Sequence, residues 1–362
     1  MASEEEKLQA IRQRIDELDA QLQQLINERA SLAQEVARVK LEAGGEAQFY
    51  RPEREAQVLR TVRERNQGPL DAEEMARLFR EIMSACLALE QPMKIAFLGP
   101  EGTYTQAAAL KHFGHSVTTV PLAVVDEVFR EVEAGTADFG VVPVENSTEG
   151  VVTHTLDRFL VSPLSVCGEV ELRIHHQLLS KEDSLSKITR VYSHQQSLGQ
   201  CREWLDANLP KIERIEVSSN AEAARRAAKE AGTAAIASEA ASEIYGLTVL
   251  AANIEDEPDN TTRFLVIGKN GTPPSGEDKT TLLISTRNEP GALFRLLEPF
   301  SRNNISMSRI ESRPSRRAMW DYVFFVDING HAEEPHVAQA LMELEKETTL
   351  LKILGSYPKA VL

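Results

Sequence analysis

The sequence has few cysteines and no long hydrophobic run. Its three cysteines, Cys86, Cys167 and Cys201, are far apart and include no CxxC pair, so they predict neither a disulfide framework nor a cysteine metal site. No apolar segment approaches the roughly 20 residues of a membrane-spanning helix. The charged N-terminus, MASEEEKLQAIRQR, does not have the pattern of a signal peptide. We therefore expect a cytoplasmic protein with no membrane partner.

Basic residues are also in the minority. The 362 residues include 40 lysines and arginines against 55 aspartates and glutamates. This balance argues against a nucleic-acid partner, because such binders normally present a basic face. It does not argue against small anionic substrates, which a local group of cations can capture. The histidines lack the spacing of a metal site, and His175 and His176 would point to opposite faces of a strand. We expect neither a metal nor a cofactor.

The chain is long enough for two or three domains. Residues 1–92 predict helices alone: a long one from about residue 5 to residue 41, a second beginning near Pro52, and a third with Asp71 as its N-cap. From residue 93 to about residue 270, short β-branched runs alternate with helical segments, which is typical of an α/β domain with a largely parallel sheet.

A linker and a third domain are predicted after that. Residues 269–279, KNGTPPSGEDK, have the composition of a linker. Residues 279–362 follow the order strand, helix, strand, strand, helix, strand, which predicts a ferredoxin-like α+β domain.

The first predicted helix has an arginine on its apolar stripe. Leucine, isoleucine and valine recur from Leu8 to Val39 in alternating steps of three and four residues, and Arg29 occupies one of these positions. Such a seam needs a partner helix along its whole length, and some 35 helical residues span about 50 Å. Two short helices can hardly cover that length, so we infer a homodimer in which the long helices pack together.

A charge on a buried stripe is costly unless it is paired. Arg29 could form a structural ion pair or extend its guanidinium into solvent. Lys40, eleven residues later, lies on nearly the same face, and two cations without an acid in step favour a bound anion. Arg54 and Glu55 add a cation and an acid at the start of the second helix. Arg12, about 25 Å from Arg29 along the helix, could reach the partner's site in an antiparallel dimer.

This segment resembles the all-helical chorismate mutase domain over residues 8–91. The resemblance implies that Arg12, reaching across the dimer, binds the substrate chorismate together with Arg29, Lys40, Arg54 and Glu55. Chorismate rearranges pericyclically to prephenate, so catalysis requires a confined reactive conformer and stabilisation of charge on the breaking ether oxygen. Guanidinium forks suit the two carboxylates of chorismate, and Lys40 suits the ether oxygen.

Three positions depart from that family's pattern. Arg51 stands where some members have aspartate, Cys86 where some have serine, and Glu90 where some have glutamine as a second donor to the ether oxygen. A glutamate can donate a hydrogen bond only when it is protonated. We therefore predict that the pKa of Glu90 is raised and that mutase activity declines as the pH rises through it.

Polar residues adjoin several predicted strands of the α/β domain. They lie in GPEGTYTQ, VVPVENSTEG, VYSHQQSLGQC and NTTRF, as Thr103, Asn146, Ser147, Ser193, His194, Thr262 and Arg263. Each motif alone could be a turn or a helix cap, and the first could bind an anion at a helix N-terminus. Together they resemble the prephenate dehydratase domain over about 93–270. That resemblance implies two lobes, similar to periplasmic binding proteins, with the second at roughly 171–246.

A dehydratase must remove the ring hydroxyl and the ring carboxylate of prephenate together. Aromatisation to phenylpyruvate drives the reaction, so the enzyme must help hydroxide to leave. The resemblance places the essential threonine at Thr262, which we interpret as a positioned hydrogen-bond donor to the leaving oxygen. We expect Arg263 to bind a substrate carboxylate as a fork. The expected polar lining consists of Thr103, Asn146, Ser147, Ser193 and His194.

The last segment resembles an ACT domain, an amino-acid-sensing module. Two motifs support this: GALF, with Gly291, Ala292, Leu293 and Phe294, and ESRP, with Glu311, Ser312, Arg313 and Pro314. On spacing alone they are a helix start and a β-turn, and spacing does not choose phenylalanine over tyrosine. The resemblance implies binding of L-phenylalanine at a dimer interface, with feedback inhibition if phenylalanine prefers a low-activity state.

The leading interpretation is a bifunctional enzyme that converts chorismate to prephenate and then to phenylpyruvate. A solute-binding protein would match the two-lobed middle segment, but the absence of a signal peptide and the fused mutase segment count against it. A regulator with a decayed active site is a third possibility. Retention of Arg12, Arg29, Lys40, Thr262 and Arg263 counts against decay, and turnover would decide.

Overall fold

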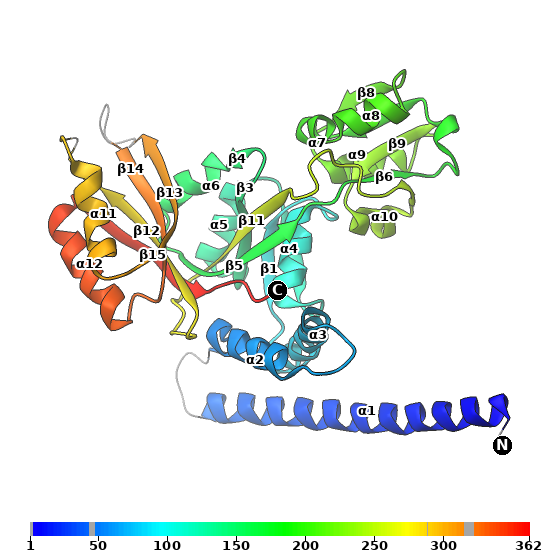
Figure 1. Cartoon of the computed structure of the whole chain (residues 1–362), viewed down its shortest axis with the longest axis horizontal. Coiled ribbons are helices and arrows are strands. Elements are labelled where there is room, and N and C mark those ends of the chain that lie inside the picture. The colour runs from blue at the N-terminus through cyan, green and yellow to red at the C-terminus, as the bar shows by residue number, and fades with distance from the viewer. Residues whose placement is uncertain (1–2, 43–47, 288, 315–321) are drawn as a thin grey trace.

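A computed structural model describes residues 3–42, 48–287, 289–314 and 322–362 of the chain. Figure 1 shows three parts in chain order: a helical part with one long rod, an α/β part with two lobes, and an α+β part. The α+β part and the second lobe lie on opposite sides of the first lobe. None of the helices in these described ranges combines the length and the hydropathy that a membrane crossing needs.

The helical part consists of α1 (Glu4–Glu42), α2 (Pro52–Arg65) and α3 (Ala72–Glu90). Acidic residues begin α1 and Lys40 lies in its last turn, in keeping with the helix dipole. The predicted cap of α3 is confirmed, because Asp71 Oδ1 accepts a hydrogen bond of 2.7 Å from the backbone N–H of Glu74. The rod α1 contacts α3, while α2 and α3 pack against the rest of the molecule.

The first α/β lobe has the strand order β2-β1-β3-β11-β5, and β4 pairs with β3. Strand β1 is parallel to β2 and β3, whereas β11 runs antiparallel to both β3 and β5. The elements are β1 (Lys94–Leu98), β2 (Thr118–Leu122), β3 (Phe139–Asn146), β4 (Gly150–Val151), β5 (Ser165–Arg173), β11 (Thr261–Gly268), α4 (Tyr104–Phe113), α5 (Val125–Ala134) and α6 (Thr153–Phe159).

The second lobe has the strand order β10-β6-β9-β7-β8. Its elements are β6 (Gln177–Ser180), η1 (Leu185–Lys187), β7 (Arg190–Ser193), α7 (Gln195–Gln200), α8 (Arg202–Asn208), β8 (Glu213–Glu216), α9 (Asn220–Ala227), β9 (Thr233–Ala237), α10 (Glu239–Tyr245) and β10 (Thr248–Ala251). The chain crosses into this lobe after β5 and returns in β11. The predicted lobe boundary at 171 therefore falls inside β5, which belongs to the first sheet.

The C-terminal part has the predicted ferredoxin-like order, with the sheet β13-β14-β12-β15. Its elements are β12 (Asp278–Ser285), α11 (Ala292–Arg302), β13 (Met307–Pro314), β14 (Tyr322–Asn329), α12 (Pro335–Glu347) and β15 (Leu350–Pro358). Helices α11 and α12 cover one face of this sheet (Figure 1) and share a core with it.

The other face of that sheet packs on the first lobe, so the two parts share one core. Val166 and Ile267 of the lobe belong to the same buried cluster as Phe325 and Leu354 of the C-terminal part. The approach is closest at Gly355, where an added Cβ would overlap the backbone carbonyl of Val166. A linker between two domains was predicted, and the shared core shows that the two parts are packed together.

The segment 269–279 has the composition of a linker, yet part of it is buried. The Ser275 hydroxyl donates to Asp278 Oδ1 at 2.6 Å, and both residues are buried. Arg60 of α2 donates to the carbonyl of Ser275 at 3.2 Å and to that of Glu277 at 2.7 Å. Arg63 of α2 also donates to the carbonyl of Val361 at 2.5 Å. Helix α2 is therefore hydrogen-bonded both to the segment 269–279 and to the residues after β15.

Candidate active sites

Thr262 and Asn146 face each other across the ladder between β11 and β3. The Asn146 amide donates from Nδ2 to Thr262 Oγ1 at 2.8 Å. Its orientation is determined by Oδ1, which accepts from the backbone N–H groups of Thr148 and Glu149 at 3.0 Å each. The oxygen of Thr262 is therefore an acceptor in this contact, and its own hydroxyl proton is available to donate toward the cleft.

A cleft of about 630 Å³ lies between the two α/β lobes. Four of the predicted site residues line it: Thr103, Asn146, His194 and Thr262. Thr103 is the N-cap of α4, and its hydroxyl donates to the carbonyl of Leu98 at 3.2 Å. The N-terminus of α4 therefore presents backbone N–H groups to the cleft, an arrangement that favours an anion.

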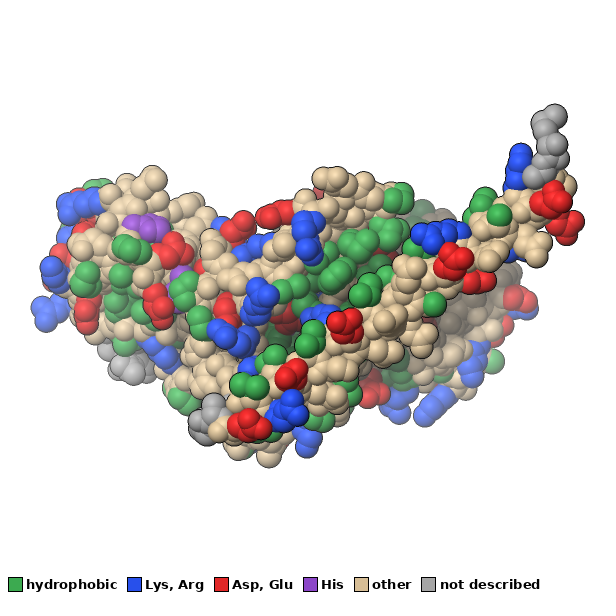
Figure 2. Space-filling view, turned by 90° about the horizontal axis from the view of Figure 1, so that it is seen from below, with side chains coloured by type: hydrophobic (Ala, Val, Ile, Leu, Met, Phe, Trp, Pro, Cys, Tyr) green, Lys and Arg blue, Asp and Glu red, His purple; other side chains and the backbone are tan. Residues whose placement is uncertain are grey.

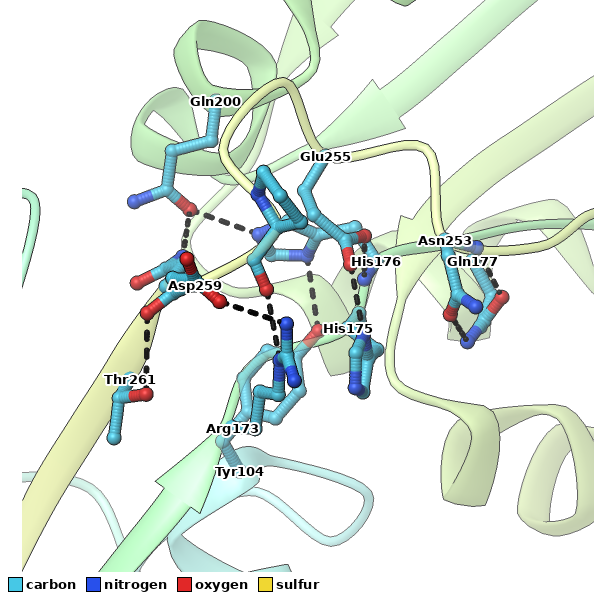
Figure 3. Close-up of polar contacts among 12 residues, drawn as sticks. Tyr104, Arg173, His175, His176, Gln177, Gln200, Asn253, Glu255, Asp259 and Thr261 are labelled. Carbon is cyan, nitrogen blue, oxygen red and sulfur yellow. Dashed lines mark hydrogen bonds and ion pairs between the residues drawn. The ribbon is translucent and has the colours of Figure 1, made fainter.

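A series of hydrogen bonds at the cleft joins residues from five segments. His176 contacts the Tyr104 hydroxyl through Nδ1 at 2.9 Å and Gln200 Oε1 through Nε2 at 2.8 Å (Figure 3). The amide of Asn260 donates to the same Gln200 oxygen at 3.2 Å, and Asn146 donates to Asn260 Oδ1 at 2.8 Å. These hydrogen bonds therefore connect α4 to the Asn146–Thr262 pair.

Burial lowers the pKa of His176, so the imidazole is neutral near pH 7 and its Nε2 donates to the Gln200 oxygen. The residues predicted from the sequence do not include Tyr104, His176, Gln200 or Asn260. Asn260 is the first residue of NTTRF, Gln200 lies within VYSHQQSLGQC and Tyr104 within GPEGTYTQ, so these three motifs already pointed to them. His176 has no such signal, because its partners are distant in sequence.

The two segments that cross between the lobes are bound to each other. Arg173 forms an ion pair of 2.9 Å with Asp259, and His175 Nδ1 contacts Glu255 Oε1 at 2.7 Å. Gln177 and Asn253 also exchange hydrogen bonds through the Gln177 amide (Figure 3). These contacts give the crossing segments one defined arrangement at the end of the cleft.

Ser147 and Ser193 lie outside the cleft lining. Ser147 is exposed and its hydroxyl oxygen accepts from the backbone N–H of Thr261 at 3.0 Å. Ser193 is fully buried, with its hydroxyl 3.0 Å from Asn220 Oδ1 and 3.2 Å from the carbonyl of Ile236. Both side chains bond to neighbouring segments instead.

Arg263 is turned away from the cleft, which corrects the expectation that it binds a substrate carboxylate. Successive side chains of a strand point to opposite faces, so Arg263 cannot share the face of Thr262. Its guanidinium contacts Glu169 at 2.9 Å and also Asp327 of the C-terminal sheet. Its third partner is the Tyr357 hydroxyl, at 2.9 Å. With all of these partners it has no free fork for a substrate.

The helical part brings Arg29, Lys40 and Glu90 together. Burial raises the pKa of Glu90, and the nearby Lys40 and Arg29 lower it without cancelling the rise. The ammonium of Lys40 also donates to the carbonyls of Gln48 and Phe49, at 3.1 and 3.4 Å. The raised pKa of Glu90 has the predicted direction. Cys86 is buried one turn before Glu90 on α3.

The other predicted mutase residues lie elsewhere on one chain. Glu55 forms an ion pair with Arg80 of α3 and lines a small cavity of about 30 Å³ that also contacts His112 of the α/β part. Arg51 is exposed and pairs with Glu53 at 2.6 Å, and Arg54 is exposed on the same helix. Arg12 is exposed near the opposite end of α1 from Lys40.

The apolar stripe of α1 is exposed over most of its length. Leu25, next to Arg29 on the stripe, is 61% exposed. The other exposed members are Leu8, Ile11, Ile15, Leu18, Leu22, Leu32, Val36 and Val39. Figure 2, which views the molecule from below, shows such hydrophobic side chains on the rod between charged ones. This face lacks the cover that its composition requires.

The two motifs of the C-terminal part lie at a helix start and on an edge strand. Gly291 is the N-cap of α11 with φ of +79°, a backbone conformation that suits glycine. Phe294 in the first turn is 68% exposed. Residues Glu311, Ser312, Arg313 and Pro314 end β13, the edge strand, and Arg313 pairs with Asp157 of α6 at 3.0 Å.

Comparisons with known proteins agree with this division. The chain matches family models for chorismate mutase type II over residues 11–91, prephenate dehydratase over 95–272 and the ACT domain over 280–346. It is 60% identical to a bifunctional chorismate mutase/prephenate dehydratase of Stutzerimonas stutzeri, over 99% of this chain and 100% of that one. The protein of the same description in Pseudomonas aeruginosa is 59% identical, with the same coverage.

A solved structure also resembles the last two parts. The prephenate dehydratase of Arthrobacter aurescens, in complex with L-Phe, is 36% identical and superposes with a TM-score of 0.68, covering 73% of this chain and 89% of that one. With relatives of about 60% identity along its full length, the chain belongs to the family of bifunctional chorismate mutase/prephenate dehydratases.

Proposed function

We propose that this chain catalyses two consecutive reactions, chorismate to prephenate and prephenate to phenylpyruvate, and that L-phenylalanine inhibits it. The observation that supports the second reaction most directly is the Asn146–Thr262 pair in the cleft between the lobes. Family membership and the match to both enzyme domains support the pairing of the two activities.

In the dehydratase reaction, Thr262 donates a hydrogen bond from its hydroxyl to the leaving oxygen of prephenate. Asn146 holds the threonine oxygen from the other side, so the hydroxyl has one direction left for donation. The N-terminus of α4 at Thr103 supplies N–H donors for a substrate carboxylate, a role that Arg263 cannot fill from the opposite face. Loss of carbon dioxide supplies the electron pair that aromatises the ring and expels the ring hydroxyl as hydroxide. The hydroxide then takes up a proton from solvent to become water.

In the mutase reaction, Arg29, Lys40 and Glu90 form one part of the site, and Arg12 of a second chain completes it. The exposed stripe of α1 supports this assembly, because a second α1 packed along it would bury the stripe. In an antiparallel pair, Arg12 of one helix lies near Arg29 of the other. We propose a homodimer as the smallest active unit for this reaction.

Feedback inhibition is assigned to the C-terminal part. The match to the ACT domain and the likeness to a dehydratase solved with L-Phe support phenylalanine as the ligand. The residues proposed to bind it are those of the GALF and ESRP motifs, which this chain places at the start of α11 and the end of β13.

One incubation tests these proposals together. Purified protein is given chorismate, and prephenate and phenylpyruvate are followed with and without phenylalanine. Formation of phenylpyruvate that phenylalanine suppresses is expected. Accumulation of prephenate alone would reject the role of Thr262, and binding of phenylalanine without any turnover would favour a regulator.

A further inference from the structure

The ladder between β3 and β11 has two faces with different neighbours. Thr262 is paired in register with Asn146, and the next residues along the two strands, Arg263 and Glu145, are paired with each other. Side chains alternate between faces along a strand. The first pair lines the cleft, and the second pair therefore points toward the C-terminal sheet.

Arg263 is the centre of a buried polar cluster between the two parts. Its guanidinium contacts Glu169 of β5 and Asp327 of β14, and its side chain is 11% exposed. Lys279 of β12 also contacts Glu169, at 2.7 Å. Two cations and two carboxylates thus balance in charge, which is the condition for keeping such groups buried.

A hydroxyl relay completes this cluster on the C-terminal side. Thr281 donates to Asp327 Oδ1 at 2.6 Å, so its oxygen accepts from the Tyr357 hydroxyl at 2.7 Å. The oxygen of Tyr357 accepts in turn from Arg263 at 2.9 Å. All three C-terminal strands that face Arg263 are therefore connected to it through hydrogen bonds.

Glu145 makes the second link. It forms an ion pair of 2.8 Å with Arg309 of β13, whose side chain is 10% exposed. Strand β13 also carries the ESRP motif, which begins two residues after Arg309 and ends the strand at Pro314. Both members of the outward-facing pair, Arg263 and Glu145, are thus anchored to the C-terminal sheet, and each is bonded through the backbone to one member of the catalytic pair.

We propose that Arg263 and Glu145 are positioning residues for the dehydratase reaction, through which the C-terminal sheet sets the geometry of the Asn146–Thr262 pair. The proposal rests on the catalytic role proposed for Thr262. Adjacent Cα atoms are about 3.8 Å apart, so a shift of either anchor moves the neighbouring catalytic residue. A misplacement of about 1 Å can cost on the order of a hundredfold in rate.

The test uses the full-length protein and the ion pair that is easier to remove. Glu145 is 38% exposed, so its carboxylate can be solvated when Arg309 is replaced. We expect Arg309→Gln and Glu145→Gln each to lower dehydratase kcat by about tenfold. KM should stay within about twofold, because the change affects the hydrogen bond from Thr262 to the transition state and leaves substrate binding intact. The double variant should be no worse than either single variant, since both remove one link.

Lys352→Gln is the matched control. Lys352 of β15 also bonds across the same interface, to the carbonyls of Phe159 and Ser162 at 3.1 and 2.6 Å, but these residues are not on β3 or β11. Its dehydratase kcat should equal that of the wild type. Mutase turnover of every variant should be unchanged, which shows that the preparation is folded.

A second variant, Arg263→Lys, keeps the charge and removes the fork. It should lower kcat at least as much as Arg309→Gln; if it does not fold, the Glu145–Arg309 pair still decides. Unchanged kcat in both Arg309→Gln and Glu145→Gln, or losses that multiply in the double variant, would overturn the positioning role. Thr262→Ala is measured in parallel: full activity there would instead reject the proposed function.

Discussion

The two catalytic regions of this chain differ in how much of a site one chain provides. In the α/β part, Thr262, Asn146, Thr103 and His194 surround one cleft within a single chain. On α1, Arg29 and Lys40 lie near Glu90 at one end, whereas Arg12 is about 25 Å away along the rod. A site between two lobes needs only the fold of its own chain, while a site on a single extended helix needs a second helix.

The largest effect is expected for Thr262→Ala. Loss of a preorganised donor to a transition state costs about a hundredfold to a thousandfold in kcat, and KM should change far less. Thr261→Ala is the matched control, because the Thr261 hydroxyl bonds to the carbonyl of Asp259 and does not line the cleft. Steady-state dehydratase kinetics measure both; equal losses in the two variants would contradict the role of Thr262.

The next effect is expected for Leu25→Glu on the exposed stripe of α1. Each chain would bring an unpaired carboxylate into the seam between the two helices. Burying such a charge costs several kcal/mol, and each loss of about 1.4 kcal/mol weakens the dimer by a factor of ten. Mutase turnover should fall at least about tenfold, and dehydratase turnover should persist. Gln24→Glu adds the same charge beside the stripe and should leave both activities intact. Equal mutase activity in the two variants would show that the stripe is not an interface.

Gly355→Ala should affect the α/β and C-terminal parts, which share one core, and spare the helical part. The added methyl group would overlap the backbone carbonyl of Val166, and such overpacking typically costs about 1–3 kcal/mol. Thermal unfolding should report the loss, with reduced dehydratase activity and normal mutase activity. Gly271→Ala is the control, since nothing lies near its added methyl group. If both variants melt like the wild type, the docking of the two sheets is wrong.

The smallest effect concerns the pH dependence of the mutase reaction. Burial raises the pKa of Glu90, and only its protonated form can donate to the ether oxygen. Mutase activity should therefore be highest below this pKa and decline as the pH rises through it. Glu90→Gln, which donates at every pH, should flatten the profile. An unchanged pH dependence in that variant would remove Glu90 from the reaction.

Much of the architecture could be predicted because its signals are local. Apolar spacing predicted α1, Asp71 predicted the start of α3, and the order of elements predicted the ferredoxin-like sheet. The shared core could not be predicted in the same way. It depends on the packing of β15 against β5, segments almost 200 residues apart on the chain, and Gly355 in the sequence gives no sign of its contact.

The error on Arg263 was avoidable. The alternation that was expected of His175 and His176 on a strand applies equally to Thr262 and Arg263, so the two could not both line one cleft. Ser193 is a different case. It ends β7 within a recognisable motif, and only the tertiary packing against Asn220 shows that it is buried.

Subunit complementation tests the difference between the two sites most directly. Chains with Arg12→Ala are coexpressed with chains carrying Arg29→Ala, each inactive as a mutase alone. In random homodimers half of the assemblies are mixed, each with one intact shared site, so about a quarter of wild-type mutase activity should return. Thr262→Ala coexpressed with Asn146→Ala should restore no dehydratase activity. Mutase activity that stays at background in the mixture would contradict a site shared between chains.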